Sequence, residues 1–335
     1  MDAAGSGRWM QVALRALSGR RREHSSPELG RLSWYEAGPP GRAREPTPLL
    51  LIHSINAAPS AYEVKPLYDH YCAARPVYAL DLPGFGFSER SDRRYTPRLM
   101  TDAIHAIVAH IRRLHGARAV DAIALSLSAE FLGRAACEAP QAFRSVAFVS
   151  PTGFDRPTLR EGPAGESLAK PWLLALLTRL RLRRALFALL TRPRTIRRFL
   201  ERSWGRREID EGLWKYDCLT TRPAGAEFAP MHFLAGYLFS ADSGSVYRRL
   251  QVPVWAVHGD RGAFTDFRAL ALLADRHHWH TDVMQTGALP HFERPQEFIE
   301  RYESWLAGAT RDKNSGQRAE TPEAAETAEV VATAE

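Results

Sequence analysis

The chain has 335 residues, of which 45% are hydrophobic and 25% are charged, a balance that excludes a wholly disordered chain, a collagen-like repeat and a coiled coil. Its three cysteines are far apart in the sequence, so we expect no disulfide framework and favour a reducing, cytoplasmic location. No run approaches the roughly 18 uncharged apolar residues that a membrane-spanning helix requires. The formal net charge of +7 leaves nucleic acid, an anionic membrane surface and an acidic substrate as partners to weigh.

Short apolar runs that alternate with helical patterns predict a doubly wound, mostly parallel α/β sheet. Such runs are typical of strands that are buried on both faces. The predicted strands are residues 29–36, 49–52, 77–80, 120–125, 146–149, 252–257 and 281–285. The predicted helices of this core are residues 61–71, 97–114, 128–138, 267–274 and 295–306.

The pattern divides the chain into four regions. Residues 1–28 are expected to be an N-terminal extension with a short amphipathic helix. Residues 29–151 and 250–307 form the predicted core, and residues 152–249, which show no clear strand, form an inserted helical cap. The acidic, Ala- and Thr-rich residues 308–335 are predicted to be a disordered tail.

The predicted strand at residues 120–125 leads directly into Ser126 and then into a helix. A strand–turn–helix of this kind holds a serine in a strained backbone, provided that the residues two before and two after it are small. Ala124 and Ser128 meet this condition, whereas centring the motif on Ser128 would put the larger Glu130 at the flank. Ser126 is therefore the candidate nucleophile, and the alternative is a serine that only caps the following helix.

Two upstream loops also follow predicted strands. His53 and Ser54 begin a turn after residues 49–52, and a backbone N–H of this turn, that of Ile55, can supply an oxyanion hole. The loop at residues 81–88 is rich in Pro and Gly and must turn tightly.

These loops, the Ser126 elbow and a late histidine, His291, occur in an order that resembles the α/β-hydrolase superfamily. The resemblance spans roughly residues 29–306, with the helical insertion where that family carries its cap. It implies that His291 is the general base, because a serine is a poor nucleophile unless an imidazole takes its proton. Since Ile55 and Leu127 would then supply the oxyanion-binding N–H groups, we expect His53 and Ser54 to lie beside the substrate.

The acid that would orient His291 is less clearly marked. The family pattern puts it on the loop after residues 252–257, at the position of Gly262, which has no side chain. Asp260 and Asp266 bracket that position, and we rank Asp266 slightly first, although it can instead cap the next helix. Asp155 is a third option, because some relatives use the corresponding site.

The resemblance implies a serine hydrolase that acts on an ester-type small molecule through an acyl-enzyme and needs no cofactor or metal. Thioester hydrolysis, carbon–carbon bond hydrolysis and acyl transfer use the same residues and remain open. A non-catalytic binding module is the alternative, since the elbow, the His53 turn and Gly262 all depart from the family pattern. The histidines at 277, 278 and 280 lack the spacing of a structural metal site.

The positive charge is concentrated in the predicted cap. Residues 156–207 hold 14 basic and 3 acidic residues, while the core is nearly neutral. Ordinary solvated cap helices explain such a surface, and peripheral contact with an anionic membrane is the alternative. No recognition motif for nucleic acid accompanies the charge.

Overall fold

The computed structural model describes residues 15–39, 41, 43–263 and 266–319. Within these residues, eight strands form one sheet in the order β1-β2-β4-β3-β5-β6-β7-β8. The strands from β3 onward run parallel, and β1 and β2 form an antiparallel edge. Their bounds are β1 Arg20–Ser26, β2 Gly30–Ala37, β3 Leu49–Ile52, β4 Val77–Asp81, β5 Val120–Leu125, β6 Phe143–Val149, β7 Val254–Gly259 and β8 Trp279–Met284.

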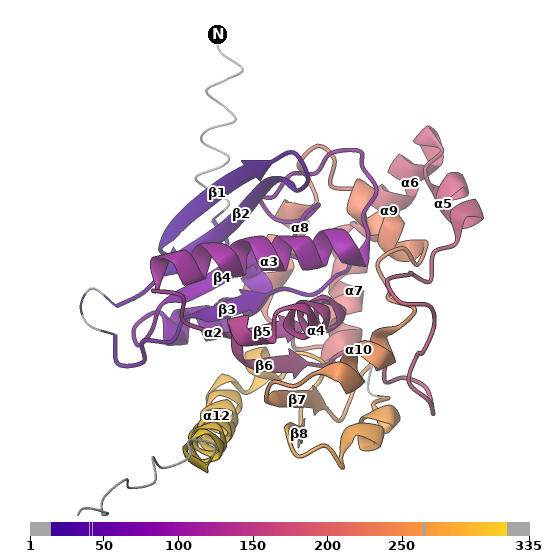
Figure 1. The fold of residues 1–335 in the computed structure, drawn as a ribbon. Helices are drawn as coiled ribbons and strands as arrows, with labels where there is room; N and C mark the ends of the chain where they lie inside the picture. Colours follow the sequence, from indigo (N-terminus) through magenta and orange to yellow (C-terminus); the bar gives the residue numbers. More distant parts are fainter. Residues whose placement is uncertain (1–14, 40, 42, 264–265, 320–335) are drawn as a thin grey trace, which may run out of the picture.

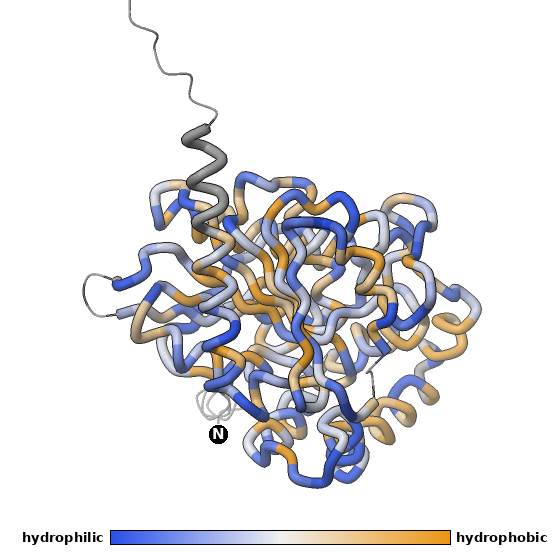
Figure 2. The backbone as a smooth tube through the Cα atoms, turned by 90° about the horizontal axis from the view of Figure 1, so that it is seen from below, coloured by the Kyte–Doolittle hydropathy of each residue, from blue (hydrophilic) through white to orange (hydrophobic). Residues whose placement is uncertain are grey.

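Helices cover both faces of this sheet (Figure 1). On one face α3 (Pro97–Leu114), α4 (Ser128–Glu138) and α10 (Ser243–Arg249) enclose one part of the core. On the other face α2 (Lys65–Tyr71) and α12 (Pro295–Ala319) enclose the second. Figure 2 shows that hydrophobic residues are concentrated in the central strands, between these two layers of helices. The structure is thus a doubly wound α/β sheet, as the sequence predicts.

Local signals explain the elements that the sequence predicts to the residue. Helix α3 begins after Thr96, whose hydroxyl accepts the N–H of Leu99, and Pro97 occupies the first turn, where no N–H partner is needed. The apolar residues of the helix lie at helical spacing and are buried against the sheet. The start and the buried face of this helix are therefore encoded by local sequence.

Between β6 and β7 the described chain consists of helices joined by loops, with one isolated bridge and no strand. Helices α5 (Pro171–Leu177), α6 (Leu180–Leu190) and α9 (Phe228–Leu234) share one small apolar cluster. Helices α7 (Pro193–Trp204) and α8 (Glu211–Thr220) share another, which reaches the core at Ala58 and Leu289. The last helix of the segment, α10, packs on α4 and belongs to the main core.

Three expectations need correction. Residues 20–26 of the predicted N-terminal extension form strand β1, while residues 1–14 lie outside the described residues. The predicted helix at 267–274 is a 3-10 helix, η3, at Arg268–Leu273. Helix α12 continues through residue 319 into the predicted tail, whose remaining residues are not among those described. No helix in the described part of the chain is long and apolar enough to cross a membrane.

Candidate active site

Ser126 lies between the end of β5 and the start of α4, at the carboxyl edge of the sheet. Its φ is +51°, a left-handed conformation that costs energy for any residue with a Cβ. The turn is held in place because the N–H of Ser126 donates to the carbonyl of Val149 at 2.8 Å. The sharp turn that the sequence predicts is therefore present, and Ser126 lines a pocket beneath the helical segment.

One departure from the family pattern near Ser126, Ser128, has a structural role. The hydroxyl of Ser128 donates to the carbonyl of His53 at 2.6 Å, which ties the elbow to the neighbouring turn. The ring of His53 is fully buried, and its Nε2 accepts the N–H of Leu82 at 3.0 Å. Burial lowers the pKa of His53 to about 4, so its ring is neutral. His53 does not line the pocket, which corrects the expectation that it lies beside the substrate.

The backbone N–H groups of Ile55 and Leu127 are the predicted oxyanion donors. Both residues line the pocket with Ser126. Among the described residues, no hydrogen-bond acceptor is found for either N–H group. Since a backbone donor in a water-poor site favours a partner, these two groups are available to an oxygen atom of a ligand.

Glu63 fixes the loop that carries Ile55. Its buried carboxylate accepts the N–H of Ser54 at 2.7 Å and the hydroxyl of Ser54 at 3.0 Å. It also accepts the side-chain amide of Asn56 at 3.1 Å. Burial raises the pKa of Glu63, while these hydrogen bonds oppose that shift. Ser54 lines the pocket, as expected, but its hydroxyl is already bound to Glu63.

The pocket around Ser126 has a volume of about 480 Å³, which is within the usual range for small-molecule sites. Its wall is mostly apolar, and core and helical segment both contribute to it. The apolar side chains are Ile55, Leu125, Leu127, Val149, Phe199, Leu200, Phe233, Phe239, Phe267 and Leu289. The polar ones include Asn56, Asp155, Arg160 and Asp266. Such a lining suits a molecule with one polar group on an apolar body.

His291 does not meet Ser126 in this structure. Its ring is fully buried, and its Nε2 donates to the backbone carbonyl of Glu63 at 2.7 Å. Its Nδ1 has no hydrogen-bond partner among the described residues, and burial lowers the pKa of the ring to about 4. From the same loop, Ala288 and Leu289 line the pocket, whereas His291 does not. No hydrogen bond joins His291 to Ser126 in this arrangement, and the role of His291 as the general base stays a prediction.

None of the three candidate acids hydrogen-bonds to His291 within the described chain. Asp266 lines the pocket, but its carboxylate pairs with Arg268 at 2.7 Å and is 41% exposed. Asp155 also lines the pocket and lies 3.4 Å from Arg160. Asp260 is exposed and does not line it. The structure thus leaves the expected acid position without a carboxylate next to the histidine.

The carboxyl end of α7 packs against two loops. We expected the acid on one of them, and the other leads to His291, the expected base. The N–H of Ala263 donates to the carbonyl of Arg202 at 2.7 Å, and that of Ala288 donates to the carbonyl of Ser203 at 2.7 Å. These bonds satisfy carbonyls that a helix end otherwise leaves unpaired. A Cβ at Gly262 would lie 2.7 Å from the Arg202 oxygen. A side chain at Gly262 therefore requires α7 to move.

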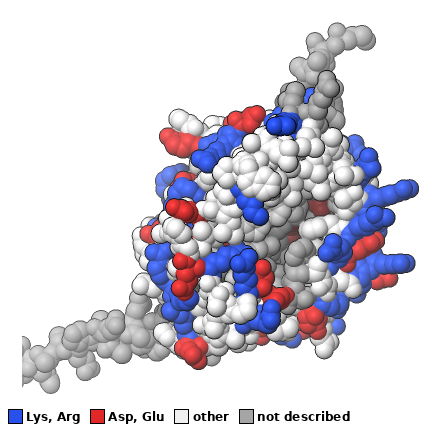
Figure 3. Space-filling view, turned by 90° about the vertical axis from the view of Figure 1, so that its right-hand side faces the viewer, with Lys and Arg blue, Asp and Glu red and all other residues white. Residues whose placement is uncertain are grey.

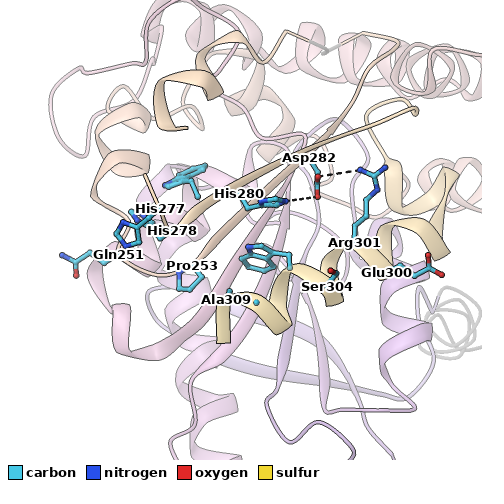
Figure 4. A pocket seen from close by; sticks show the side chains of 13 residues that line it. Gln251, Pro253, His277, His278, His280, Asp282, Glu300, Arg301, Ser304 and Ala309 are labelled. Carbon is cyan, nitrogen blue, oxygen red and sulfur yellow. Dashed lines mark ion pairs between the residues drawn. The ribbon is translucent and has the colours of Figure 1, made fainter. Parts of the chain in front are cut away.

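A second cavity, of about 880 Å³, lies away from Ser126 between β8 and α12 (Figure 4). His280 and Arg301 both point toward Asp282, at 3.5 Å and 3.8 Å. The described residues contain no group of three or more side chains that could hold a metal ion. Although it is larger, this cavity contains neither the strained serine nor the free amides, so we place the candidate site at Ser126.

Sequence reasoning missed most of the residues that line this pocket, and two of them, Glu63 and Ala288, bear on its chemistry. Glu63 lies within a predicted helix, and the sequence held no signal that its carboxylate would turn back to Ser54. Ala288 carries no functional group, so only its place two residues before the helix-starting Pro290 marked it. That Ala288 enters the pocket, and His291 does not, depends on how the loop packs against α7.

Comparisons with known proteins agree on the fold. A family model described as the Alpha/beta hydrolase family matches residues 49–301, more than half of the chain. A probable hydrolytic enzyme from Pseudomonas aeruginosa is 16% identical, with a TM-score of 0.64 over 87% of this chain and 95% of its own. A thermophilic esterase from Thermogutta terrifontis is 17% identical, with a TM-score of 0.63 over 87% and 99% of the two chains.

A carboxylesterase from Bacillus subtilis is 16% identical, with a TM-score of 0.63 over 91% of this chain and 98% of its own. The search among curated proteins finds no match. At these identities, the solved structures are evidence for a shared fold, and the chemistry has to be argued from the residues in the pocket.

Proposed function

Because this chain belongs to the alpha/beta hydrolase family, we propose that its pocket binds a small acyl molecule, such as a carboxylic ester or the corresponding acid. In this proposal Ser126 helps to hold the ligand oxygen and turns the ligand over slowly at most. The observation that carries the proposal is the pocket itself. It is lined by a strained serine and by two residues whose backbone N–H groups have no acceptor in the described chain, and Ala288, not His291, lines it from the loop on which the base was expected.

Three donors support the choice of ligand. The N–H groups of Ile55 and Leu127 and the hydroxyl of Ser126 belong to residues of one pocket. Each can donate to an oxygen, and a carbonyl or carboxylate oxygen accepts two such hydrogen bonds. The apolar lining of the same pocket favours a hydrocarbon chain on the other side of that group.

No histidine lines the pocket around Ser126 in the described part of the chain, and this supports binding over rapid turnover. A general base contributes about 10²- to 10⁴-fold to a reaction of this type, and an unassisted serine is a weak nucleophile at neutral pH. His291 donates to Glu63 instead, and the pocket wall at Ala288 offers only a methyl group. We therefore expect an ester to bind and dissociate many times before Ser126 cleaves it.

Isothermal titration calorimetry with butyrate, octanoate and methyl octanoate tests this proposal. We expect at least one of them to bind, and Ala288→Phe to weaken binding by about tenfold or more because the new ring fills the pocket. Ala274→Phe is the matched control, since Ala274 is exposed and does not line the pocket. Failure of all three probes to bind, or equal effects of both variants, would contradict the proposal.

A serine hydrolase is the second candidate, and both the membership of the alpha/beta hydrolase family and the φ of +51° at Ser126 support it. A strained serine between strand and helix has a cost that binding alone does not require. In this alternative Ser126 attacks the ester carbonyl, and Ile55 and Leu127 stabilise the oxyanion. His291 would have to leave the Glu63 carbonyl and reach Ser126, with Asp266 or Asp260 as its partner. The result would be acyl-enzyme hydrolysis that depends on Ser126.

A further inference from the structure

Helices α5 and α6 carry an unusual number of apolar side chains on their outer surface. Six of the ten large apolar side chains that are exposed in the described chain lie between residues 168 and 199. Trp172 is 68% exposed, and Leu182 and Leu189 are 41% and 49% exposed. A group of such side chains within one segment of a soluble fold marks a contact surface, whereas scattered ones do not.

The two faces of α6 show why this surface is not part of the core. Phe187 and Arg183 are buried beneath the helix, and Arg183 stacks over the ring of Phe228 at 4.5 Å. Leu182 and Leu189 lie one face away, at helical spacing with the exposed Ala185. Helix α6 is therefore apolar on both sides, although only the inner side packs against the protein.

Arginines surround these apolar side chains. Residues 167–200 contain eight arginines and one lysine but no Asp or Glu. Arg179, Arg184 and Arg192 are exposed, and no carboxylate among the described residues pairs with them. Figure 3, which looks onto the end of the molecule that carries α5 and α6, shows an uncharged area with Lys and Arg side chains, and some Asp and Glu side chains, around it.

We propose that the outer surface of α5 and α6, with Trp172, Leu182 and Leu189 flanked by Arg179 and Arg184, docks onto an anionic lipid surface. Apolar side chains that enter the boundary between headgroups and acyl chains, with arginines at the headgroups, are how a helix lies on a membrane without crossing it. Each arginine near an anionic bilayer adds attraction that salt weakens.

The charge of this surface also favours an anionic lipid bilayer over two other partners, a second copy of the chain and nucleic acid. A second copy of the chain would bring two arginine-rich, acid-free surfaces together, which like-charge repulsion opposes in a symmetric dimer. Nucleic acid would use the arginines but not the exposed leucines. An anionic bilayer complements both the charge and the apolar side chains.

Flotation of the full chain with lipid vesicles tests the proposal. We expect binding at low ionic strength to phosphatidylcholine mixed with phosphatidylglycerol, weaker binding to phosphatidylcholine alone, and partial release near 1 M salt, where the Debye length is about 3 Å. The charge variant Arg179→Glu/Arg184→Glu and the apolar variant Leu182→Ser/Leu189→Ser should each weaken binding by about tenfold or more.

Matched controls lie elsewhere on the fold. Arg113→Glu/Arg118→Glu makes the same change in net charge at the far end of α3, where both arginines are exposed. Leu114→Ser/Leu272→Ser removes two leucines that are 58% and 55% exposed. Both controls should bind within about twofold of the unchanged protein.

Any of the following results would overturn the proposal. The first is no flotation with anionic vesicles at low ionic strength. The second is equal loss in the test and control pairs, which would indicate adsorption through overall charge. The third is full binding by the apolar variant. The fourth is a dimer in light scattering that the same substitutions dissociate.

Discussion

Ser126 combines a strained backbone with a hydroxyl that has no hydrogen-bond partner among the described residues. Its conformation could be predicted from the sequence, because the strand, the small flanks and the helix start are adjacent along the chain. The surroundings of its hydroxyl could not, because Ala288 comes from a loop more than 160 residues away. The sequence therefore predicts the backbone conformation of Ser126, but it does not predict which side chains surround the hydroxyl group.

His291 illustrates the same limit. Its position after the last strand favours a catalytic role, yet its ring is buried and donates to Glu63. Whether a loop side chain enters the pocket or the core depends on which residue faces α7, and the pattern of a single sequence does not contain that information.

The buried ring of His291 makes a prediction about acid stability. Burial lowers its pKa from 6.5 to about 4 in the folded chain, so between these pH values the unfolded chain binds more protons at this position. Folding stability should therefore fall as the pH falls from about 6.5 to 4, by at most about 1.4 kcal/mol per pH unit for one such group.

His291→Gln removes this titration while keeping a side-chain donor for the Glu63 carbonyl. Urea unfolding at several pH values should show that the variant loses less stability than the unchanged protein across this window. Parallel curves for the two proteins would mean that His291 is not buried in its neutral form.

At the scale of elements, α3 and β1 show what a sequence pattern can and cannot give. Helix α3 is predicted to the residue, because its cap, its Pro97 and its apolar face are all local. Strand β1 was missed, because its residues Arg20–Ser26 are mostly polar and exposed. An edge strand of this composition is recognisable only from its hairpin partner, β2.

The docking of α7 makes the second prediction. A Cβ at Gly287 would clash with the carbonyl of Ser203 and lie 2.5 Å from the Cα of Trp204, so Gly287→Ala should push the helix end away from the pocket wall. We expect destabilisation of about 1–3 kcal/mol, the usual cost of overpacking, together with weaker ligand binding.

Gly308→Ala is the matched control for this substitution. Gly308 lies within α12, and nothing within 4 Å would meet its new Cβ, so alanine should be neutral or stabilise the helix by up to about 1 kcal/mol. Thermal unfolding measures both variants. Equal melting temperatures for the two would contradict the tight contact between Gly287 and α7.

At the scale of the whole molecule, the structure shows which of the basic side chains behind the net charge of +7 are exposed. The basic excess that the sequence places in residues 156–207 includes exposed arginines on α6 and others held in place. Arg183 is buried close to Asp92 and Glu227, and Arg197 pairs with Glu211. Only the exposed arginines are available to contact a partner. The sequence alone does not separate them from the buried or paired ones.

The α/β-hydrolase fold could be read from the sequence, because strand–helix alternation and the Ser126 elbow are both visible there. Whether Ser126 is an activated nucleophile depends on the placement of loop side chains, which the sequence pattern alone does not determine. Ala288 lines the pocket, Gly262 faces the end of α7, and His291 lies in the core.

Labelling with a fluorophosphonate probe at neutral pH tests the central claim most directly, because the probe reacts with a serine that a nearby base activates. We predict that the unchanged protein is labelled no faster than Ser126→Ala, with both proteins folded by circular dichroism. Rapid labelling that Ser126→Ala abolishes would contradict this account and establish Ser126 as an activated nucleophile.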